Sequence, residues 1–138
     1  MEITLMKNPR LMFLGALLVT TLAHSETARD FASRYENAAR AANPGFAISA
    51  ARGAEFFRAR HGQEWTCASC HTVNPATTGQ HVTTSKPITP LAPSANPERF
   101  TSADKVEKWF KRNCKDVVGR ECTPAEKGDV VAYLLAMR

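Results

Sequence analysis

Apolar side chains recur with helical spacing in four stretches of the chain. The first stretch, residues 27–43, ends at the helix-breaking pair Pro44-Gly45, and the second, residues 49–62, ends at Gly62. The apolar positions of the first stretch follow an i, i+3, i+4, i+7 pattern. They are Ala28, Phe31, Ala32, Tyr35, Ala38, Ala39 and Ala42. Both stretches therefore predict amphipathic helices.

The third stretch begins near Thr101 and puts Val106, Trp109 and Phe110 on one helix face. The fourth, residues 123–136, opens Thr-Pro-Ala-Glu, which places a threonine at the N-cap, proline at the first helical position and glutamate at the third. No stretch alternates between apolar and polar residues as a half-buried strand does. The sequence therefore predicts an all-α fold.

Residues 72–100 lack such periodicity and are rich in proline. An irregular segment of this length is unusual in a single compact domain. A chain of this size also has limited apolar surface to bury. We therefore expect a large apolar group other than protein to fill part of the core.

The N-terminus has the pattern of a secretory signal. Basic residues precede an apolar run over residues 11–23, which is shorter than the roughly 20 residues of a membrane span. We expect residues 1–25 to be cleaved, with an uncleaved signal that anchors the chain as the alternative. The mature protein is expected to be soluble and periplasmic, without a membrane span. It would consist of a helical extension, residues 26–48, and one domain, residues 49–138.

Residues 65–72 read WTCASCHT and allow three interpretations. A redox dithiol of the thioredoxin kind would follow a strand, and none is predicted. A zinc site would recruit the chain's other two cysteines, but such sites belong mostly to reducing compartments. In an exported chain, C-x-x-C-H is typical of covalent haem attachment, with Cys67 and Cys70 on the ring and His71 on the iron. The second ring nitrogen of His71 is expected to donate to a backbone carbonyl of the proline-rich segment.

The arrangement also resembles the class I cytochrome c fold, with an additional N-terminal helix. In that family a glycine and an aromatic residue before the haem motif cross an aromatic–aliphatic pair on the last helix. The corresponding residues here are Gly53, Phe57, Tyr133 and Leu134. Ordinary members of the family place a methionine on the other side of the iron. This chain has methionines at positions 1, 6, 12 and 137 alone, so we expect a different distal ligand.

Cys114 and Cys122 remain after haem attachment, and an oxidising compartment favours their pairing. Asn113 directly precedes this pair, and an asparagine near a helix C-terminus is commonly a left-handed cap. The sequence, however, resembles the oxygen-binding cytochromes typified by the sphaeroides haem protein, whose distal ligand is an asparagine just before such a bridge. The related cytochromes c″ have histidine there. The resemblance includes PLAPSANPERFT (90–101) and CTPAEKGDVVAYLLA (122–136), and it implies that Asn113 binds the iron.

Several neighbouring residues have competing interpretations. His81 is the rival distal ligand, and it could instead contact a haem propionate or lie exposed in its loop. Trp109 and Phe110 would either line the distal pocket or fill the core beneath it. Lys86 could pair with a propionate or remain exposed, and His61 is expected to cap the end of its helix.

The asparagine has chemical consequences. A carboxamide oxygen is a neutral, hard donor that suits ferric iron better than ferrous iron. We therefore expect Asn113 to leave the iron on reduction, so that O2, NO or CO can bind while the protein takes part in electron transfer. The alternative is a plain electron carrier with permanent six-coordinate iron, for instance through His81. An enzymatic role such as a peroxidase ranks last because no distal acid–base pair is visible, although reduction of O2 or NO stays open.

The net charge is +5, and basic residues gather in residues 105–115. They are Lys105, Lys108, Lys111, Arg112 and Lys115. The cluster fits docking of an acidic redox protein, and a solvated helix face explains the same residues. The family resemblance implies electron delivery from a dihaem cytochrome c and a membrane cytochrome b. An exported haem protein without interleaved aromatic and basic residues is not expected to bind nucleic acid.

Overall fold

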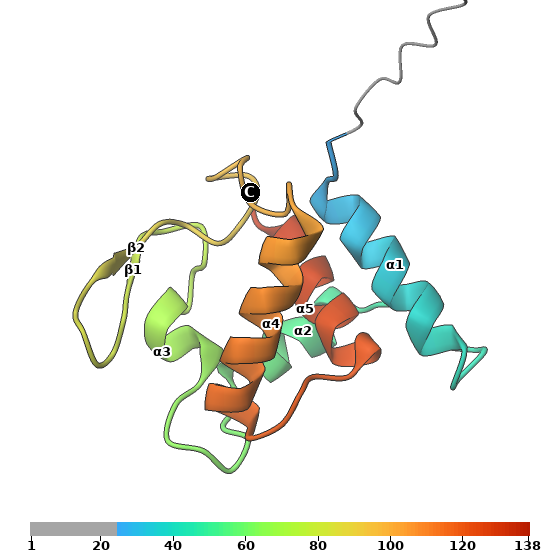
Figure 1. Ribbon diagram of the computed structural model, residues 1–138, viewed down its shortest axis with the longest axis horizontal. Helices are drawn as coiled ribbons and strands as arrows, with labels where there is room; N and C mark the ends of the chain where they lie inside the picture. The colour runs from blue at the N-terminus through green and yellow to red at the C-terminus, as the bar shows by residue number, and fades with distance from the viewer. Residues whose placement is uncertain (1–24) are drawn as a thin grey trace, which may run out of the picture.

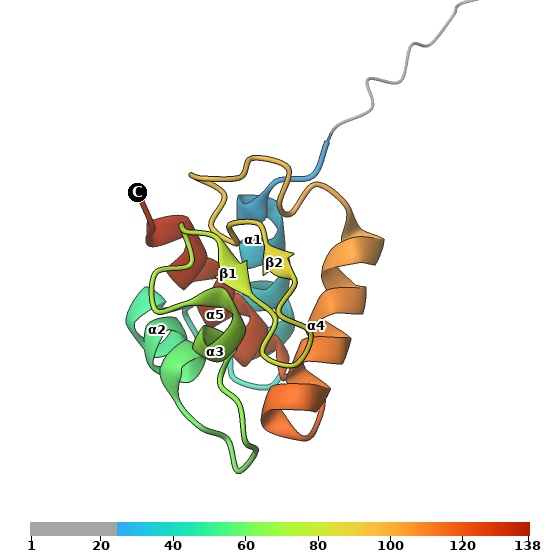
Figure 2. The same ribbon diagram turned by 90° about the vertical axis from the view of Figure 1, so that its left-hand side faces the viewer.

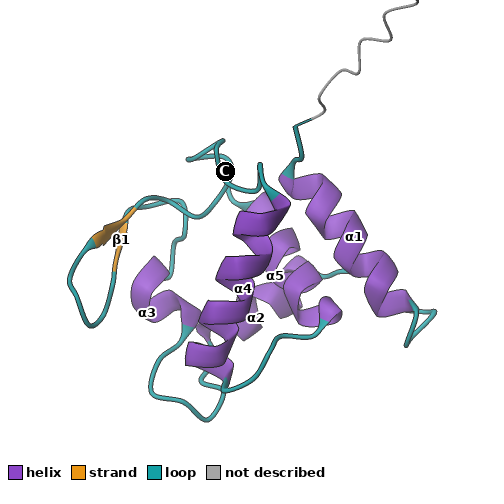
Figure 3. Cartoon of the chain, in the orientation of Figure 1, coloured by secondary structure: helices purple, strands orange, loops and turns teal. Residues whose placement is uncertain are grey.

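The computed structural model describes residues 25–138, so the predicted signal peptide, apart from its last residue, lies outside the described residues. Figures 1 and 3 show a helical protein. The helices are α1 (Ala28–Arg40), α2 (Ala50–Arg58), α3 (Cys67–His71), α4 (Ala103–Val118) and α5 (Pro124–Ala136). The all-α prediction is confirmed, but a short antiparallel pair of strands, β1 (Gly79–Gln80) and β2 (Pro87–Ile88), was not predicted. Within residues 25–138, no helix has the length and apolar character needed to cross a membrane.

Helix α1 begins where the sequence predicts and ends earlier. A capping box between Thr27 and Asp30 satisfies backbone N–H groups of its first turn. The helix ends at Arg40, before the predicted end at residue 43. Ala38 and Ala42, which the pattern placed on the buried face, are exposed. The pattern overestimated the width of the buried face at Ala38, because α1 contacts the rest of the protein along a narrow stripe, and Ala42 lies beyond the end of the helix.

Helix α5 is the centre of the core, because both α1 and α2 pack along it. Gly53 of α2 lets the two backbones approach, with Asp129 of α5 on the other side of the contact. The rings of Phe57 and Tyr133 lie 5.5 Å apart across the same crossing, and Leu134 is fully buried. These are the contacts expected of the class I cytochrome c arrangement.

Outside its short hairpin, the proline-rich segment 72–100 is ordered by hydrogen bonds to backbone carbonyls. The carbonyl of Pro75 accepts bonds from the backbone N–H groups of Leu91 and Ala92, at 2.8 and 3.0 Å. The guanidinium of Arg99 donates to two further backbone carbonyls at 2.8 and 2.9 Å. Backbone carbonyls outside helices and strands need hydrogen-bond donors from elsewhere in the chain. These bonds supply such donors and so hold the segment in a single conformation.

Helix α4 lies apart from α3 in both views of the chain (Figures 1 and 2). Helix α5 packs closely on α1 and α2, whereas no comparable packing joins α4 to α3 in the part of the chain that the structure describes. The haem motif and the helix that carries Asn113 are thus on separate parts of the fold.

Candidate haem site

Helix α3 places the two cysteines of the C-x-x-C-H motif on one side of a single helical turn. A capping box starts this helix, in which the Thr66 hydroxyl accepts from the Ser69 N–H at 3.1 Å and the Ser69 hydroxyl accepts from the Thr66 N–H at 3.0 Å. Residues three apart on a helix are neighbours on its surface. Cys67 and Cys70 are therefore adjacent, and both are free and half-buried.

The state of these thiols bears on the redox-dithiol interpretation. Burial, together with the nearby Cys70, raises the pKa of Cys67 to about 11, so this thiol is protonated at neutral pH. A reactive dithiol instead needs a lowered pKa. The segment before α3 contains no strand in residues 59–66 either. The geometry therefore does not support a thioredoxin-like site.

His71 ends helix α3, because the following residue, Thr72, has a positive φ of 61° with an extended ψ of 168° and cannot continue the helix. Its ring lies 6.3 Å from the ring of Phe57. Burial, and to a smaller extent the positive charge of Arg99, lowers the pKa of His71 to about 4. The imidazole is therefore neutral at pH 7, which is the form that ligates a metal.

The expected hydrogen bond from the His71 ring to a loop carbonyl is not present among the described residues. The Pro75 carbonyl, near the start of the proline-rich segment, instead accepts from Leu91 and Ala92. Strand β1 packs against the haem motif from outside: a Cβ at Gly79 would stand 2.1 Å from the Cys70 carbonyl oxygen. The hairpin thus supports α3 through direct backbone contact.

Asn113 lies inside helix α4 and is not its cap. The helix continues to Val118, and the left-handed capping residue is Gly119, with φ 78°. Asn113 is one turn from Phe110 and one turn from Val117, so helical geometry puts it on the apolar face of α4. Val117 is buried, yet Asn113 is exposed. Within residues 25–138, protein atoms therefore leave the Asn113 side chain uncovered.

A disulfide between Cys114 and Cys122 joins the last turns of α4 to the loop just before α5, with the two Cα atoms 5.6 Å apart. This pairing is the one expected from the sequence. It also removes both cysteines as zinc ligands. Within residues 25–138 no group of three or more His, Cys, Asp and Glu side chains could hold a metal ion.

The exposed apolar residues fit a large apolar group at this place. Three large hydrophobic side chains are exposed in the described part of the chain, namely Trp65, Val73 and Trp109. Trp65 and Val73 flank the haem motif, and Trp109 is one turn before Asn113 on α4. A large apolar group bound between the motif and α4 would cover exposed side chains of this kind. Together with two adjacent thiols and a neutral imidazole that makes no hydrogen bond within residues 25–138, these side chains fit a haem group.

The structure separates the two aromatic residues whose roles were left open. Phe110 is partly buried against the core, and its ring meets that of Tyr35 edge-on at 5.6 Å. Trp109, by contrast, is 47% exposed. Phe110 therefore fills the core, and Trp109 is the one available to border a haem pocket.

The other histidines of the described region have local structural roles. The ring of His61 is hydrogen-bonded to the carbonyl of Phe56 at 2.8 Å, as expected of a residue that caps the end of α2. Nδ1 of His81 accepts the backbone N–H groups of Thr83 and Thr84, both at 3.2 Å, and so stabilises the turn between the strands.

Arg99 was not singled out by the sequence analysis, although its charge acts on His71. In the sequence, Arg99 stands out only as the one basic residue between Lys86 and Lys105. Lys86 itself is exposed at the hairpin.

Comparison with known proteins identifies relatives over most of the chain. Residues 43–134 match the family model described as Domain of unknown function (DUF1924). Cytochrome c″ from Methylophilus methylotrophus is 44% identical over 119 residues, which cover 83% of this chain and 83% of the relative. Cytochrome c-type protein SHP from Cereibacter sphaeroides is 52% identical over 71 residues, which cover 51% of this chain and 54% of the relative.

Solved structures of both relatives share the fold. The crystal structure of oxidized cytochrome c″ from Methylophilus methylotrophus superposes with a TM-score of 0.75 at 44% identity and covers 80% of this chain and 94% of that chain. Oxidized SHP, described as an oxygen binding cytochrome c, gives a TM-score of 0.73 at 40% identity and covers 83% of this chain and 100% of that chain. The chain therefore belongs to the family of c-type cytochromes that includes cytochrome c″ and SHP.

Proposed function

We propose that this protein is an exported c-type cytochrome with one covalently attached haem, whose iron is bound by His71 and, in the ferric state, by Asn113. Reduction releases Asn113, and the reduced protein then binds O2, NO or CO while it takes part in electron transfer. One haem corresponds to the one C-x-x-C-H motif of the chain. Export corresponds to the signal predicted over residues 1–25.

The exposure of Asn113 on the apolar face of α4 is the observation that carries this proposal. Asn113 borders the partly buried Phe110 and the buried Val117 of this face, and its exposed amide is open to a group outside the protein. Asn113 is acceptable there if it faces a group with which its amide interacts. Two relatives agree with this view, since SHP is described as an oxygen binding cytochrome c and a solution structure of cytochrome c″ concerns haem-ligand detachment.

The residues of the site have distinct roles in this proposal. Cys67 and Cys70 would hold the haem covalently, each by addition of its S–H across one vinyl group of the ring, so attachment would need no oxidant. When bound, the haem supplies an iron centre that changes valence and takes small ligands. His71 stays bound in both valence states as a neutral imidazole.

Asn113 acts as the redox-dependent ligand. Its carboxamide oxygen is a hard, neutral donor and therefore a poor partner for ferrous iron. On reduction Asn113 gives up its place, and its amide N–H groups are then free to donate a hydrogen bond there. The bridge between Cys114 and Cys122 limits how far the helix end can move, so that Asn113 rebinds on oxidation.

The alternative function is a plain electron carrier in which His81 completes a permanent six-coordinate iron. The turn geometry disfavours it, because Nδ1 of His81 already accepts two backbone N–H groups. If the His81 ring turned toward the iron while its turn stayed in place, both of these hydrogen bonds would be lost.

The absorption spectrum of the ferric protein tests the ligand assignment. Asn113→Ala is expected to change the ferric spectrum while ferrous binding of CO is retained. His81→Ala serves as the matched control and is expected to leave the ferric spectrum unchanged. An unaltered ferric spectrum in Asn113→Ala, or a changed one in His81→Ala alone, would contradict ligation by Asn113.

The partner of electron transfer is proposed to dock on α4. All five basic residues of the 105–115 cluster are exposed, so they can steer an acidic redox protein to the helix that also carries Asn113. The partners implied by the family resemblance are a dihaem cytochrome c and a membrane cytochrome b.

A further inference from the structure

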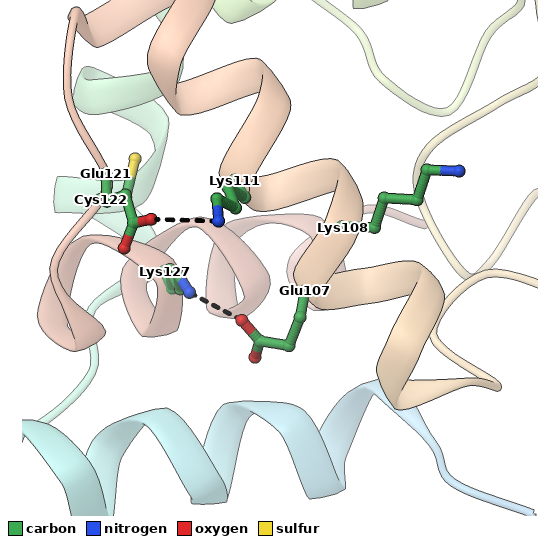
Figure 4. A pocket seen from close by; sticks show the side chains of 6 residues that line it. All are labelled: Glu107, Lys108, Lys111, Glu121, Cys122 and Lys127. Carbon is green, nitrogen blue, oxygen red and sulfur yellow. Dashed lines mark hydrogen bonds and ion pairs between the residues drawn. The ribbon is translucent and has the colours of Figure 1, made fainter.

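Glu107 of α4 joins three helices. Its carboxylate accepts a hydrogen bond of 2.6 Å from the Tyr35 hydroxyl on α1 and one of 2.8 Å from Lys127 Nζ on α5. Figure 4 shows Glu107 and Lys127 pointing toward each other beside α1, at a pocket that also borders Cys122. Tyr35 is 5% exposed. We call these three residues the Tyr35–Glu107–Lys127 cluster.

The cluster also holds Phe110 of α4. Lys127 Nζ lies 5.4 Å from the centre of the Tyr35 ring and 5.7 Å from that of the Phe110 ring, so one ammonium group faces both. The Tyr35 and Phe110 rings meet edge-on. Phe110 is therefore fixed between α1 and α5, and it is one turn before Asn113.

The protonation states of the cluster favour these contacts at neutral pH. Burial raises the pKa of Glu107, but the hydrogen bonds from Lys127 and Tyr35 outweigh burial and lower it overall. Burial and the bond to Glu107 raise the pKa of Tyr35. Glu107 is thus ionised and Tyr35 protonated, which makes their hydrogen bond charge-assisted.

Asn113 lies between two anchors of α4. One anchor is Phe110 with the cluster that holds it, and the other is the disulfide of Cys114, the next residue after Asn113. Helix α4 has no close backbone packing on α1 or α5 comparable to that between α1 and α5 themselves. Its position in the described structure therefore depends on side-chain contacts such as these.

We propose that Tyr35, Glu107 and Lys127 are positioning residues for Asn113: through them, helix α1 holds α4 where Asn113 binds the ferric iron. The inference rests on the proposed function. In this proposal the N-terminal helix α1 carries neither the haem motif nor Asn113, yet it helps to keep Asn113 on the iron. Loss of the cluster lets α4 populate more positions, and Asn113 then spends less time at the iron.

Competition with imidazole measures this effect on the ferric holoprotein. Imidazole must displace Asn113, so weaker binding of Asn113 appears as a lower dissociation constant for imidazole. Tyr35→Phe is expected to lower that constant by about threefold to tenfold, which is in the lower part of the range of coupling between contacting residues. Glu107→Gln, which changes a partly exposed side chain, is the second variant should Tyr35→Phe unfold. Glu36→Gln is the control, since Glu36 of α1 pairs with Arg40 of the same helix.

A double-mutant cycle separates positioning of Asn113 from a general change of the haem site. In an Asn113→Ala background no competitor is left, so Tyr35→Phe is expected to have no effect on imidazole binding. Tyr35→Phe and Glu107→Gln proteins that bind imidazole like wild type would overturn the inference, as would an undiminished effect in the Asn113→Ala background. If Asn113→Ala itself binds imidazole like wild type, the proposed ligation fails, and the inference fails with it.

Discussion

Gly53 of α2 lies against the backbone of Asp129 on α5, so closely that a Cβ at Gly53 would stand 1.9 Å from the Asp129 carbonyl oxygen. The two helices are also tied at this point by the ion pair of Arg52 with Asp129, at 2.8 Å. A side chain at Gly53 must therefore push the helices apart. This contact sets the orientation of α2, which leads into the haem motif.

We expect Gly53→Ala to lower the free energy of unfolding by about 3 kcal/mol or more, the upper end of overpacking effects. Guanidinium-induced unfolding of the holoprotein measures this loss. Gly45→Ala is the control, because the nearest atom to a Cβ there is 3.7 Å away, and it should change stability by less than about 0.5 kcal/mol. Equal losses in the two variants would contradict the close contact.

The start of α5 should make stability depend on pH through Glu126. The hydrogen bonds from Arg120 are the main cause of its lowered pKa, and those from Thr123 add to it. A carboxyl whose pKa is lower in the folded state stabilises the protein above its unfolded pKa, and this stabilisation is lost as the pH falls through the folded value. Glu126→Gln keeps a side chain that can complete the capping box but loses the charge that pairs with Arg120, so it should cost about 0.5 to 1 kcal/mol at pH 7.

The difference between wild type and Glu126→Gln is expected to shrink below about pH 4.5, the ordinary pKa of a glutamate. Urea unfolding of both proteins between pH 3 and pH 7 measures it. A difference that is the same at every pH would show that the charge of Glu126 does not stabilise α5.

Removal of the disulfide should affect both stability and the distal ligand. In the chain-entropy model, the short loop between Cys114 and Cys122 contributes about 2.5 kcal/mol. The double variant Cys114→Ser and Cys122→Ser is expected to lose this amount in chemical unfolding. Its ferric spectrum should also move part of the way toward that of Asn113→Ala, because Asn113 loses one of its anchors. A ferric spectrum identical to wild type would mean that the bridge does not position Asn113.

The basic cluster on α4 predicts a salt-dependent reaction with anionic redox reagents. Oxidation of the reduced protein by ferricyanide should slow as ionic strength rises, since salt screens the attraction. Lys108, which points away from the Glu107–Lys127 pair in Figure 4, is a suitable site for charge reversal. Lys108→Glu should slow the reaction more than Arg29→Glu, which makes the same change of charge on α1. Equal rates would place electron exchange away from α4.

The helices could be predicted from the sequence because periodicity and capping are local properties. The start of α5 follows from Thr123, Pro124 and Glu126, which form the expected capping box. Burial was less certain: Ala38 has the spacing of a core residue and is exposed, because spacing alone does not say how wide a contact the helix makes. The strands of the hairpin are two residues long, too short for an alternating pattern.

At the candidate site, too, some features could be predicted from the sequence and others could not. The disulfide followed from the count of cysteines and the expected compartment. The roles of Trp109 and Phe110 could not be separated, because adjacent residues on an apolar face look alike until the neighbouring helix is known. The cluster around Glu107 escaped the sequence analysis because it joins residues from three helices, and no local pattern connects them.

Binding of CO to the dithionite-reduced protein, followed by stopped-flow absorption, tests release of Asn113 most directly. If Asn113 leaves on reduction, the haem site is open, and CO should bind at a rate that rises in proportion to its concentration. If a ligand stays on the iron in both valence states, CO will bind at a slow rate independent of its concentration, or not at all, and the account of a redox-gated distal site will be wrong.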